Sequence, residues 1–269
     1  MSRHRDHRHA AIVIGCGDVG SAIAHALHVA GYAVVLTDHV DPPWARRGMG
    51  FTDAWYIGHA ELDSAVACFC ASVRTVATLL AQRLIAATTW SWAGIAQALS
   101  PAVVVDARMQ ADRSPSVLIG GATLTIGVGA GFLPGVHVDL VVDGDADAPP
   151  DVDPRLIVRA DGPGWFMTSC RVGARVRAGE TVGHVGRRPF IVPADGVLRG
   201  VSARGARVHP GVVVIEVDPG GDPASCFGLG ERQRRTAARV VYALEAHGAR
   251  AAGFAAGPST STSAIGVTG

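Results

Sequence analysis

The chain of 269 residues is predicted to be an α/β protein, with a Rossmann-like domain of parallel strands followed by a small β domain. Three observations carry this prediction: a glycine-rich turn between an apolar strand and a helix, an alternation of strands and helices up to residue 143, and an internal repeat beyond residue 154. Hydrophobic residues make up 48% of the chain and charged residues 17%, which is enough apolar material for a buried core.

The N-terminal region has the layout of a dinucleotide-binding unit. The apolar run Ala10–Ile14 predicts a strand, Gly15–Gly20 is a turn of the pattern GxGxxG that opens a helix, and Ala33–Leu36 predicts a second strand that leads to Asp38. The first glycine allows a tight turn, and the second lets the backbone approach a pyrophosphate at the helix N-terminus. The carboxylate of Asp38 is placed to accept hydrogen bonds from a ribose hydroxyl, which favours NAD over NADP.

Two other residues of this turn carry chemistry of their own. Asp18 is unusual there, because a carboxylate repels a pyrophosphate unless a cation or an arginine intervenes. Alternatively Asp18 is the N-cap of the helix, and Ser21 is suited to a similar capping part. Cys16 either uses the lowered pKa of a thiol at a helix N-terminus to carry sulfur, or it is a small residue that fills a tight turn.

The α/β alternation continues through the first domain. The pattern predicts a weak strand, two helices and two further strands at Ala54–Ile57, Val73–Gln82, Ser91–Leu99, Leu84–Thr88 and Ala102–Val105. The last strand leads into Asp106 and Arg108. Acidic residues at the carboxyl ends of parallel strands lie where such sheets bind ligands, so both are candidate site residues; a solvent-exposed ion pair is the alternative.

A second glycine-rich stretch ends this domain. Ser116–Ile119 and Leu124–Gly127 are expected to pair as a hairpin around a Gly-Gly turn, and Val136–Val142 predicts another strand. Between them, Gly129 and Gly131 either offer backbone N–H groups to a second anion or serve a tight loop.

The second half contains an internal repeat. Gly173–Val185 and Gly205–Val217 are offset by 32 residues and are identical at seven of 13 positions. The pattern resembles the barrel-sandwich hybrid of biotinyl and lipoyl carriers. All 24 Lys and Arg residues are arginines, however, so the chain carries neither biotin nor lipoate, and it has no lysine for a Schiff base or a phosphate loop. The domain is therefore expected to be structural or a docking surface.

These patterns divide the chain into a disordered basic head (1–9), a Rossmann-like domain (10–143), a linker (144–154), a barrel-sandwich-hybrid-like domain (155–221), a C-terminal helix (222–248) and a disordered tail (249–269). A net charge of +1 gives no basic field for nucleic acid. The expected location is the cytoplasm, without membrane binding, because no signal peptide and no unbroken apolar span is found. Metal binding is not expected either, because the five cysteines include no CxxC pair.

Six short motifs follow one another along Ile12–Leu244: Gly15-x-Gly17-Asp18, Arg46-Arg47…Phe51…Ala54…Tyr56-x-Gly58, Val105-Asp106-Ala107, the loop Ile126–Gly135, the hairpin region Val192–Val197, and Asp218-Pro219…Cys226-Phe227. Their combination resembles the YqeB-like accessory proteins of the selenium-dependent molybdenum hydroxylase system. The chain departs from that pattern at Ala130, where the family has proline, and at Asp143–Asp147, where it has Arg-Gly-His. The resemblance implies a functional face of Asp18, Arg46, Arg47, Asp106 and the loop Gly127–Gly135.

The resemblance implies a maturation protein that binds a nucleotide or pterin phosphate and docks on a client molybdenum hydroxylase. An NAD-dependent oxidoreductase is an alternative, although His59, His137 and His209 are scattered. A non-catalytic scaffold with a vestigial dinucleotide fold is another, and both catalysis and homo-oligomer formation stay open. The expected contacts of an NAD(P) or molybdopterin-type cofactor are Gly15, Gly17, Asp18, Gly20, Ser21, Asp38, Arg46, Arg47, Asp106, Arg108, Gly127, Gly129, Gly131 and Gly135.

Overall fold

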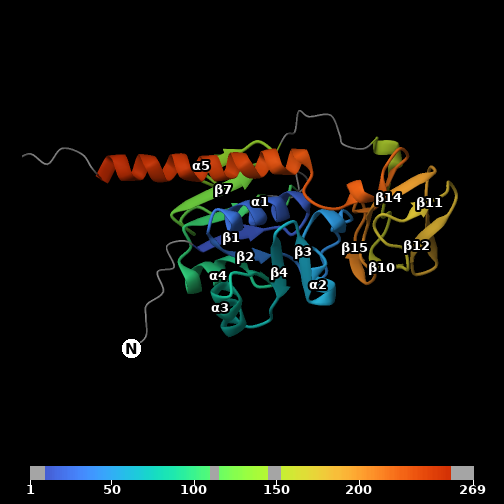
Figure 1. Ribbon diagram of the computed structural model, residues 1–269, viewed down its shortest axis with the longest axis horizontal. Coiled ribbons are helices and arrows are strands. Elements are labelled where there is room, and N and C mark those ends of the chain that lie inside the picture. The colour runs from blue at the N-terminus through green and yellow to red at the C-terminus, as the bar shows by residue number, and fades with distance from the viewer. Residues whose placement is uncertain (1–9, 110–114, 145–152, 256–269) are drawn as a thin grey trace, which may run out of the picture.

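An eight-stranded sheet organises the first part of the molecule (Figure 1). The computed structural model describes residues 10–109, 115–144 and 153–255, with side chains as far as residue 248. In spatial order the strands are β3 (His59–Leu62), β4 (Ala65–Phe69), β5 (Ile85–Thr88), β2 (Ala33–Thr37), β1 (Ala10–Ile14), β6 (Val103–Asp106), β7 (Leu124–Val128) and β8 (Leu140–Val142). Neighbouring strands are parallel except β3 and β4, which confirms the α/β class and the parallel sheet.

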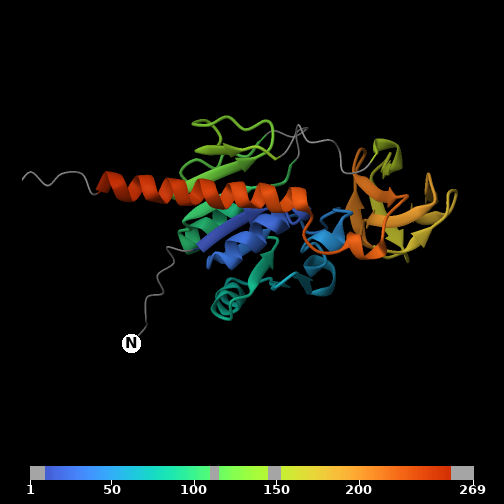
Figure 2. The same ribbon diagram turned by 45° about the horizontal axis from the view of Figure 1, so that its top comes forward.

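Helices cover both faces of this sheet, as Figures 1 and 2 show. One face carries α1 (Asp18–Val29) and α5 (Glu231–Ala255), and the other carries α3 (Val73–Ala81) and α4 (Trp92–Leu99). The short α2 (Ala54–Ile57) also packs on the first face. All five positions of β1 are buried, as expected of a central parallel strand with apolar side chains pointing to both covered faces.

The order of the strands places a crevice beside β1. From β1 the chain continues to β2, which lies on one side of β1, whereas β6 lies on the other side of β1. The loops that follow β1 and β6 therefore diverge above opposite faces, and the gap between them at the carboxyl ends of the strands is where open α/β sheets bind ligands.

Two predictions for this sheet are wrong, and a third is confirmed only in part. Ala54–Ile57 is the helix α2, which ends at Gly58 with a left-handed φ of 88°. Ser116–Ile119 forms no hairpin with Leu124–Gly127, because the Leu118 N–H donates to His137 O at 2.7 Å while β7 pairs in parallel with β6. The predicted strand Val136–Val142 is shortened to Leu140–Val142, and the strand pair β3–β4 was not predicted.

Two four-stranded antiparallel sheets form the second part of the described chain, here called the antiparallel module. Their strand orders are β13 (Arg188–Ile191), β12 (Thr181–Val185), β10 (Gly164–Thr168), β15 (Ala206–Val208), and β9 (Ile157–Arg159), β16 (Val213–Asp218), β14 (Gly196–Val201), β11 (Arg175–Val176). The offset of 32 residues carries β10, β11 and β12 onto β14, β15 and β16, so the repeat of sequence is also a repeat of structure. Both sheets share one apolar core around Phe166 and Leu198.

Three short 3₁₀ turns, η2 (Arg47–Met49), η3 (Pro154–Leu156) and η4 (Pro223–Cys226), complete the described elements. From η4 the chain returns to the first sheet as α5. Ala237, Val240 and Leu244 recur at helical spacing, and all three are buried in the core that α1 also lines. Because α5 continues to Ala255, the prediction of a disordered tail is wrong for 249–255. The head 1–9, the linker residues 145–152 and the tail beyond 255 lie outside the described residues.

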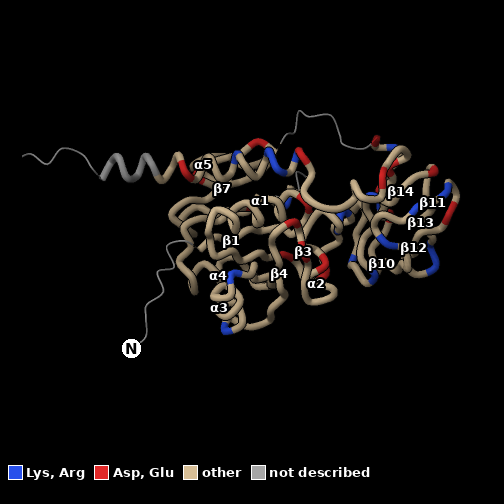
Figure 3. The backbone as a smooth tube through the Cα atoms, in the orientation of Figure 1, with Lys and Arg blue, Asp and Glu red and all other residues tan. Residues whose placement is uncertain are grey.

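Charged residues are unevenly spread along the chain, as Figure 3 shows. They are sparse around α3, α4 and β7 and denser along the first part of α5 and over the antiparallel module. In the described part of the chain, no helix combines the length and the apolar character that a membrane crossing requires.

Replacing Val240 by Ala is expected to lower the free energy of unfolding by about 2 kcal/mol, because it removes two buried methyl groups and leaves a cavity between α5 and the sheet. Tyr242→Ala on the same helix is the matched control, since the Tyr242 side chain is 73% exposed. Urea unfolding of both variants measures the difference. An equal loss in the two variants would contradict the packing of α5 described here.

Candidate functional site

The glycine turn after β1 owes two of its glycines to the fold itself. Gly15 has a φ of 106° and donates its N–H to Thr37 O at 2.9 Å. A Cβ on Gly20 would lie 1.9 Å from the Gly15 carbonyl oxygen, so only glycine lets α1 approach the turn this closely. Gly17 instead lies beneath the indole of Trp44, which a Cβ would meet at 3.1 Å. An aromatic ring thus takes the place beside Gly17 that was expected for a pyrophosphate.

Asp38 is directed into the fold rather than toward a ligand. Its carboxylate is 8% exposed. Oδ2 accepts from the Cys16 N–H and the Trp44 Nε1–H, both at 2.7 Å, and Oδ1 accepts from the His39 N–H at 2.7 Å. These three bonds tie the glycine turn, the end of β2 and Trp44 together, so the carboxylate acts as a structural acceptor in this structure.

Asp18 is the first residue of α1, and Gly17 is the N-cap, so the capping alternative for Asp18 is wrong. Its Oδ1 accepts from the Val19 N–H at 3.0 Å. Its Oδ2 accepts from Arg46 Nη1 at 3.2 Å and from Gln233 Nε2 at 2.7 Å. A carboxylate beside a pyrophosphate was expected to need a cation or an arginine, and Arg46 is the arginine that pairs with Asp18.

Ser21 is not a cap either. It bridges two turns, since its Oγ donates to Cys16 O at 2.9 Å and accepts from the Phe51 N–H at 2.8 Å. The side chain is fully buried and serves the fold.

Arg46 continues the network into the antiparallel module. Its Nε donates to both carboxylate oxygens of Glu216 on β16, at 3.1 and 2.9 Å, and Arg199 Nε lies 3.6 Å from the same carboxylate. The Glu216 side chain is 4% exposed, and a carboxylate buried to this extent is stabilised by pairing with arginines. The chain of contacts Gln233–Asp18–Arg46–Glu216 joins α5, α1 and the antiparallel module.

Asp106 and Arg108 form a forked pair at the end of β6. Arg108 Nε donates to Asp106 Oδ1 at 2.9 Å, and its Nη2 donates to Oδ2 and, at 2.6 Å, to Ser116 Oγ. The hydrogen bond from Arg108 to Asp106 raises the pKa of the guanidinium, which stays charged. Because Asp106 is 1% exposed, the alternative of a solvent-exposed pair is wrong.

These groups surround a cavity of about 170 Å³ in the crevice between β1 and β6, here called the switch-point cavity. Its walls come from four separate segments, which contribute Gly17, Asp18, Val19, Trp44, Arg46, Ala107, Arg108, Met109, Arg232 and Gln233. Three arginines and one aspartate thus face one small space at the N-terminus of α1. Such a lining is suited to an oxyanion, because guanidinium groups and helix N–H groups are both donors.

Several expected site residues lie outside this cavity. Arg47 forms an ion pair with Asp53, in the turn that precedes α2. The second glycine loop is separated from the cavity by Met109, which a Cβ on Gly129 would meet at 3.0 Å, and the Gly129 N–H donates to Val142 O. Gly127 lies under the Phe132 ring. Gly131 and Gly135 have φ values of 97° and 76°, as tight turns require.

Sequence reasoning missed Trp44, Met109, Arg232 and Gln233. Arg232 Nη2 donates to Gly144 O at 3.2 Å. Arg232 and Gln233 begin a helix whose charge pattern is that of any amphipathic surface helix, so no local signal distinguishes them. The only hint was the combination of basic and amide groups in the first turn.

Cys16 is fully buried, and its Sγ lies 3.8 Å from Thr52 Oγ1. Burial and the nearby Asp38 carboxylate raise the pKa of the thiol well above its ordinary value. The buried and protonated thiol favours the alternative in which Cys16 is a small residue that fills the tight turn, over the alternative in which Cys16 carries sulfur. His59, His137 and His209 are not brought together: His59 is on β3, His137 Nδ1 accepts from the Leu133 N–H, and His209 is on the antiparallel module. Nor do the described residues hold a group of three or more His, Cys, Asp or Glu arranged for a metal ion.

Comparison with known proteins gives one curated relative and a few weak structural likenesses; no protein-family model matches. The chain is 22% identical over 253 residues to the "Uncharacterized protein YqeB" of Escherichia coli (strain K12), which covers 87% of this chain and 47% of that protein. The likeness supports a YqeB-like family. The chain spans about half the length of this relative.

Among solved structures, a succinylglutamatedesuccinylase/aspartoacylase from Rhodobacter sphaeroides is 24% identical over 33% of this chain and 28% of its own, with a TM-score of 0.22. The apo ectoine utilization protein EutE (DoeB) from Ruegeria pomeroyi is 12% identical over 78% of this chain and 86% of its own, with a TM-score of 0.25. At such TM-scores neither likeness carries an argument about fold or activity.

Iodoacetamide at neutral pH is expected to leave Cys16 unmodified in the folded protein, because the raised pKa keeps the thiol protonated and burial excludes the reagent. Modification should begin only as the pH rises far above neutral or when the chain is unfolded in urea. Cys68 and Cys170, which are partly exposed, serve as internal controls. Peptide mass spectrometry that found Cys16 modified before both of these would show that its thiolate is accessible.

Glu216→Gln is expected to lower the free energy of unfolding by about 3 kcal/mol, because it leaves Arg46 and Arg199 facing a neutral amide at a buried position. Glu180→Gln on the exposed surface of the same module is the matched control and should change stability by less than about 0.5 kcal/mol. Denaturant titration distinguishes the two. A Glu216→Gln protein as stable as the control would mean that the network does not join the modules.

Proposed function

We propose that this protein is a non-redox accessory protein, which binds a phosphate-bearing cofactor or cofactor precursor in the switch-point cavity and serves a molybdenum hydroxylase. The observation that carries the binding part is the convergence of Arg46, Arg108 and Arg232 on one cavity at a helix N-terminus. The hydroxylase part is supported by the resemblance of the sequence motifs to the accessory family.

The chemistry of the lining favours phosphate over a neutral ligand. The switch-point cavity offers an anion guanidinium forks and backbone N–H groups, which match the geometry of phosphate oxygens. Asp18 does not oppose this, because Arg46 and Gln233 already bind its carboxylate. Arg108, likewise oriented by Asp106, retains a fixed direction in which to donate.

The size of the cavity limits what it holds. About 170 Å³ is below the usual range of roughly 300–1,000 Å³ for whole small-molecule sites, so the cavity accommodates a phosphate and its neighbouring atoms while the rest of the ligand extends outward. Trp44 covers Gly17, and Asp38 is occupied by three hydrogen bonds. These contacts favour a pterin phosphate or mononucleotide over NAD(P) bound along a Rossmann-like turn.

The antiparallel module supports a docking role within this proposal. Its two repeat-related antiparallel sheets support the interpretation as a barrel-sandwich hybrid, and without lysine it carries no swinging arm. Trp165 on β10 and Ile191 on β13 are 53% and 49% exposed on one of these sheets. Large exposed apolar side chains are characteristic of protein contact surfaces, and a client hydroxylase in the cytoplasm is the partner proposed here.

Arg232→Gln is expected to weaken binding of inorganic pyrophosphate about tenfold, the equivalent of about 1.4 kcal/mol, because one charged donor is lost from the cavity while the helix is retained. Arg235→Gln is the matched control: it lies on the same helix, pairs with Glu231 and does not line the cavity. Isothermal titration calorimetry at low salt measures both.

Absence of pyrophosphate binding by the wild-type chain, or equal weakening by the two substitutions, would contradict the binding part of the proposal. The accessory part is tested separately, by hydroxylase activity in cells that carry either variant. Full hydroxylase activity with Arg232→Gln, despite lost binding, would remove the link between this cavity and the hydroxylase.

A further inference from the structure

A second cavity, larger than the switch-point cavity, lies where the antiparallel module meets the loop that follows β2. It measures about 320 Å³ and is here called the junction cavity. The loop after β2 contributes His39, Val40 and Pro43, and the antiparallel module contributes Arg207, His209 and Val212. Asp41 also borders it. None of these side chains belongs to the switch-point cavity.

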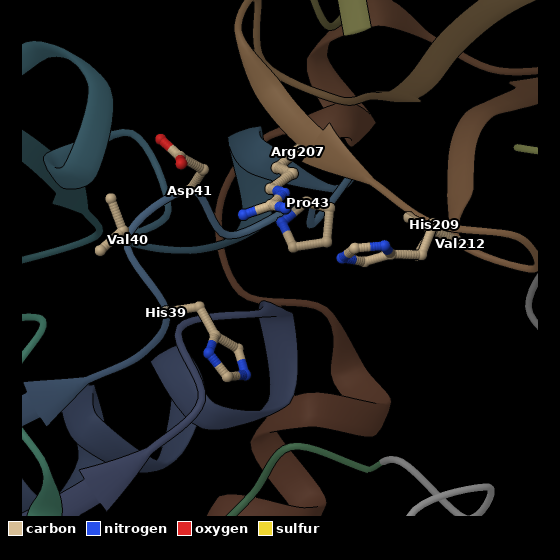
Figure 4. A pocket seen from close by; sticks show the side chains of 7 residues that line it. All are labelled: His39, Val40, Asp41, Pro43, Arg207, His209 and Val212. Carbon is tan, nitrogen blue, oxygen red and sulfur yellow. The ribbon is translucent and has the colours of Figure 1, made fainter. Parts of the chain in front are cut away.

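The cavity is lined by three side chains that can donate hydrogen bonds, three apolar side chains and one carboxylate. Figure 4 shows the Arg207 guanidinium and the His209 imidazole on the side of the antiparallel module, the His39 imidazole on the side of the parallel sheet, and the Asp41 carboxylate directed away from both imidazoles. The Arg207 guanidinium also lies 5.9 Å from the centroid of the Trp165 ring, which restricts its orientation. Val40, Pro43 and Val212 provide an apolar surface beside these donors.

Contacts between the modules hold the two walls in place. Ser202 Oγ donates to Pro43 O at 3.0 Å, and the Val201 N–H donates to Ala45 O at 2.9 Å. Next to them, Arg46 binds Glu216. The loop that forms one wall is therefore joined to the antiparallel module at three nearby residues, Pro43, Ala45 and Arg46. The cavity is already formed without a ligand, so binding requires little free energy to order its walls.

We propose that the junction cavity is a second binding site, specific for a phosphate monoester such as a nucleoside monophosphate. The phosphate lies between Arg207, His209 and His39, and the organic part of the ligand lies on the apolar surface of Val40, Pro43 and Val212. A charged fork beside a small apolar surface matches this class of ligand, whereas an inorganic anion would leave the apolar surface unused. The site lies outside the carboxyl end of β2, one strand from the switch point.

The internal repeat provides the comparison that isolates this site. The offset of 32 residues makes Arg175 the counterpart of Arg207 and Arg177 the counterpart of His209. Both pairs are exposed and lie at corresponding places in the two sheets. Only the second copy faces the loop 39–43, so the cluster becomes a site through its position at the junction and not through the repeat itself.

The test is calorimetric titration of the full-length chain with AMP, and with adenosine as the ligand that lacks the phosphate. The wild-type chain is expected to bind AMP and to bind adenosine at least tenfold more weakly. Arg207→Gln is expected to weaken AMP binding about tenfold, whereas Arg175→Gln, the repeat-related control, leaves it unchanged. Thermal unfolding of both variants verifies that the module is intact.

Three outcomes would overturn the inference: no AMP binding by the wild-type chain at millimolar concentration, equal effects of Arg207→Gln and Arg175→Gln, or AMP binding that Arg232→Gln removes and Arg207→Gln preserves. The last result would place AMP in the switch-point cavity. The proposed function fails independently, when Arg232→Gln leaves pyrophosphate binding intact, so the two proposals are distinguished by the same set of variants.

Discussion

The pairing of Arg46 with both Asp18 and Glu216 is the interaction on which the arrangement of this protein depends. Glu216 is a nearly buried carboxylate on the antiparallel module, and burial of a carboxylate is costly unless it is paired with a cation and hydrogen-bonded. Arg199 on β14 is one cation beside it, and the other, Arg46, comes from the first part of the chain and also contacts the carboxylate at the start of α1. The Arg46 guanidinium thus links the glycine turn to the antiparallel module, and it lines the switch-point cavity.

Features whose causes are local could be predicted from the sequence. The glycine turn is one example, because Gly15 and Gly20 lie five residues apart and their close approach is a property of any such turn. The internal repeat is another, since identical glycines at positive φ, such as Gly173 and Gly205, produce identical turns. The apolar face of α5 follows from helical spacing alone. In each case the residues that decide the structure are close together in the chain.

Roles that depend on distant partners could not be predicted. Asp18 finds Gln233, which is 215 residues away, and Arg46 finds Glu216, which is 170 residues away. Asp38 follows the glycine turn at the spacing of a carboxylate that binds a ribose, yet it accepts a hydrogen bond from the Trp44 indole. The spacing alone does not show that the Trp44 side chain reaches Asp38. The hairpin expected before β7 failed for the same reason: Leu124–Val128 is buried along its whole length and pairs with a central strand instead of its sequence neighbour.

The return of α5 to the first sheet has a consequence for the order in which the protein matures. On the ribosome the residues of the first sheet emerge long before Glu231–Ala255, so the face of α1 that α5 covers has no partner during most of synthesis. Arg232 and Gln233 close the switch-point cavity, and they too emerge last. In a newly made chain the walls of the switch-point cavity are therefore complete only after the antiparallel module has been translated.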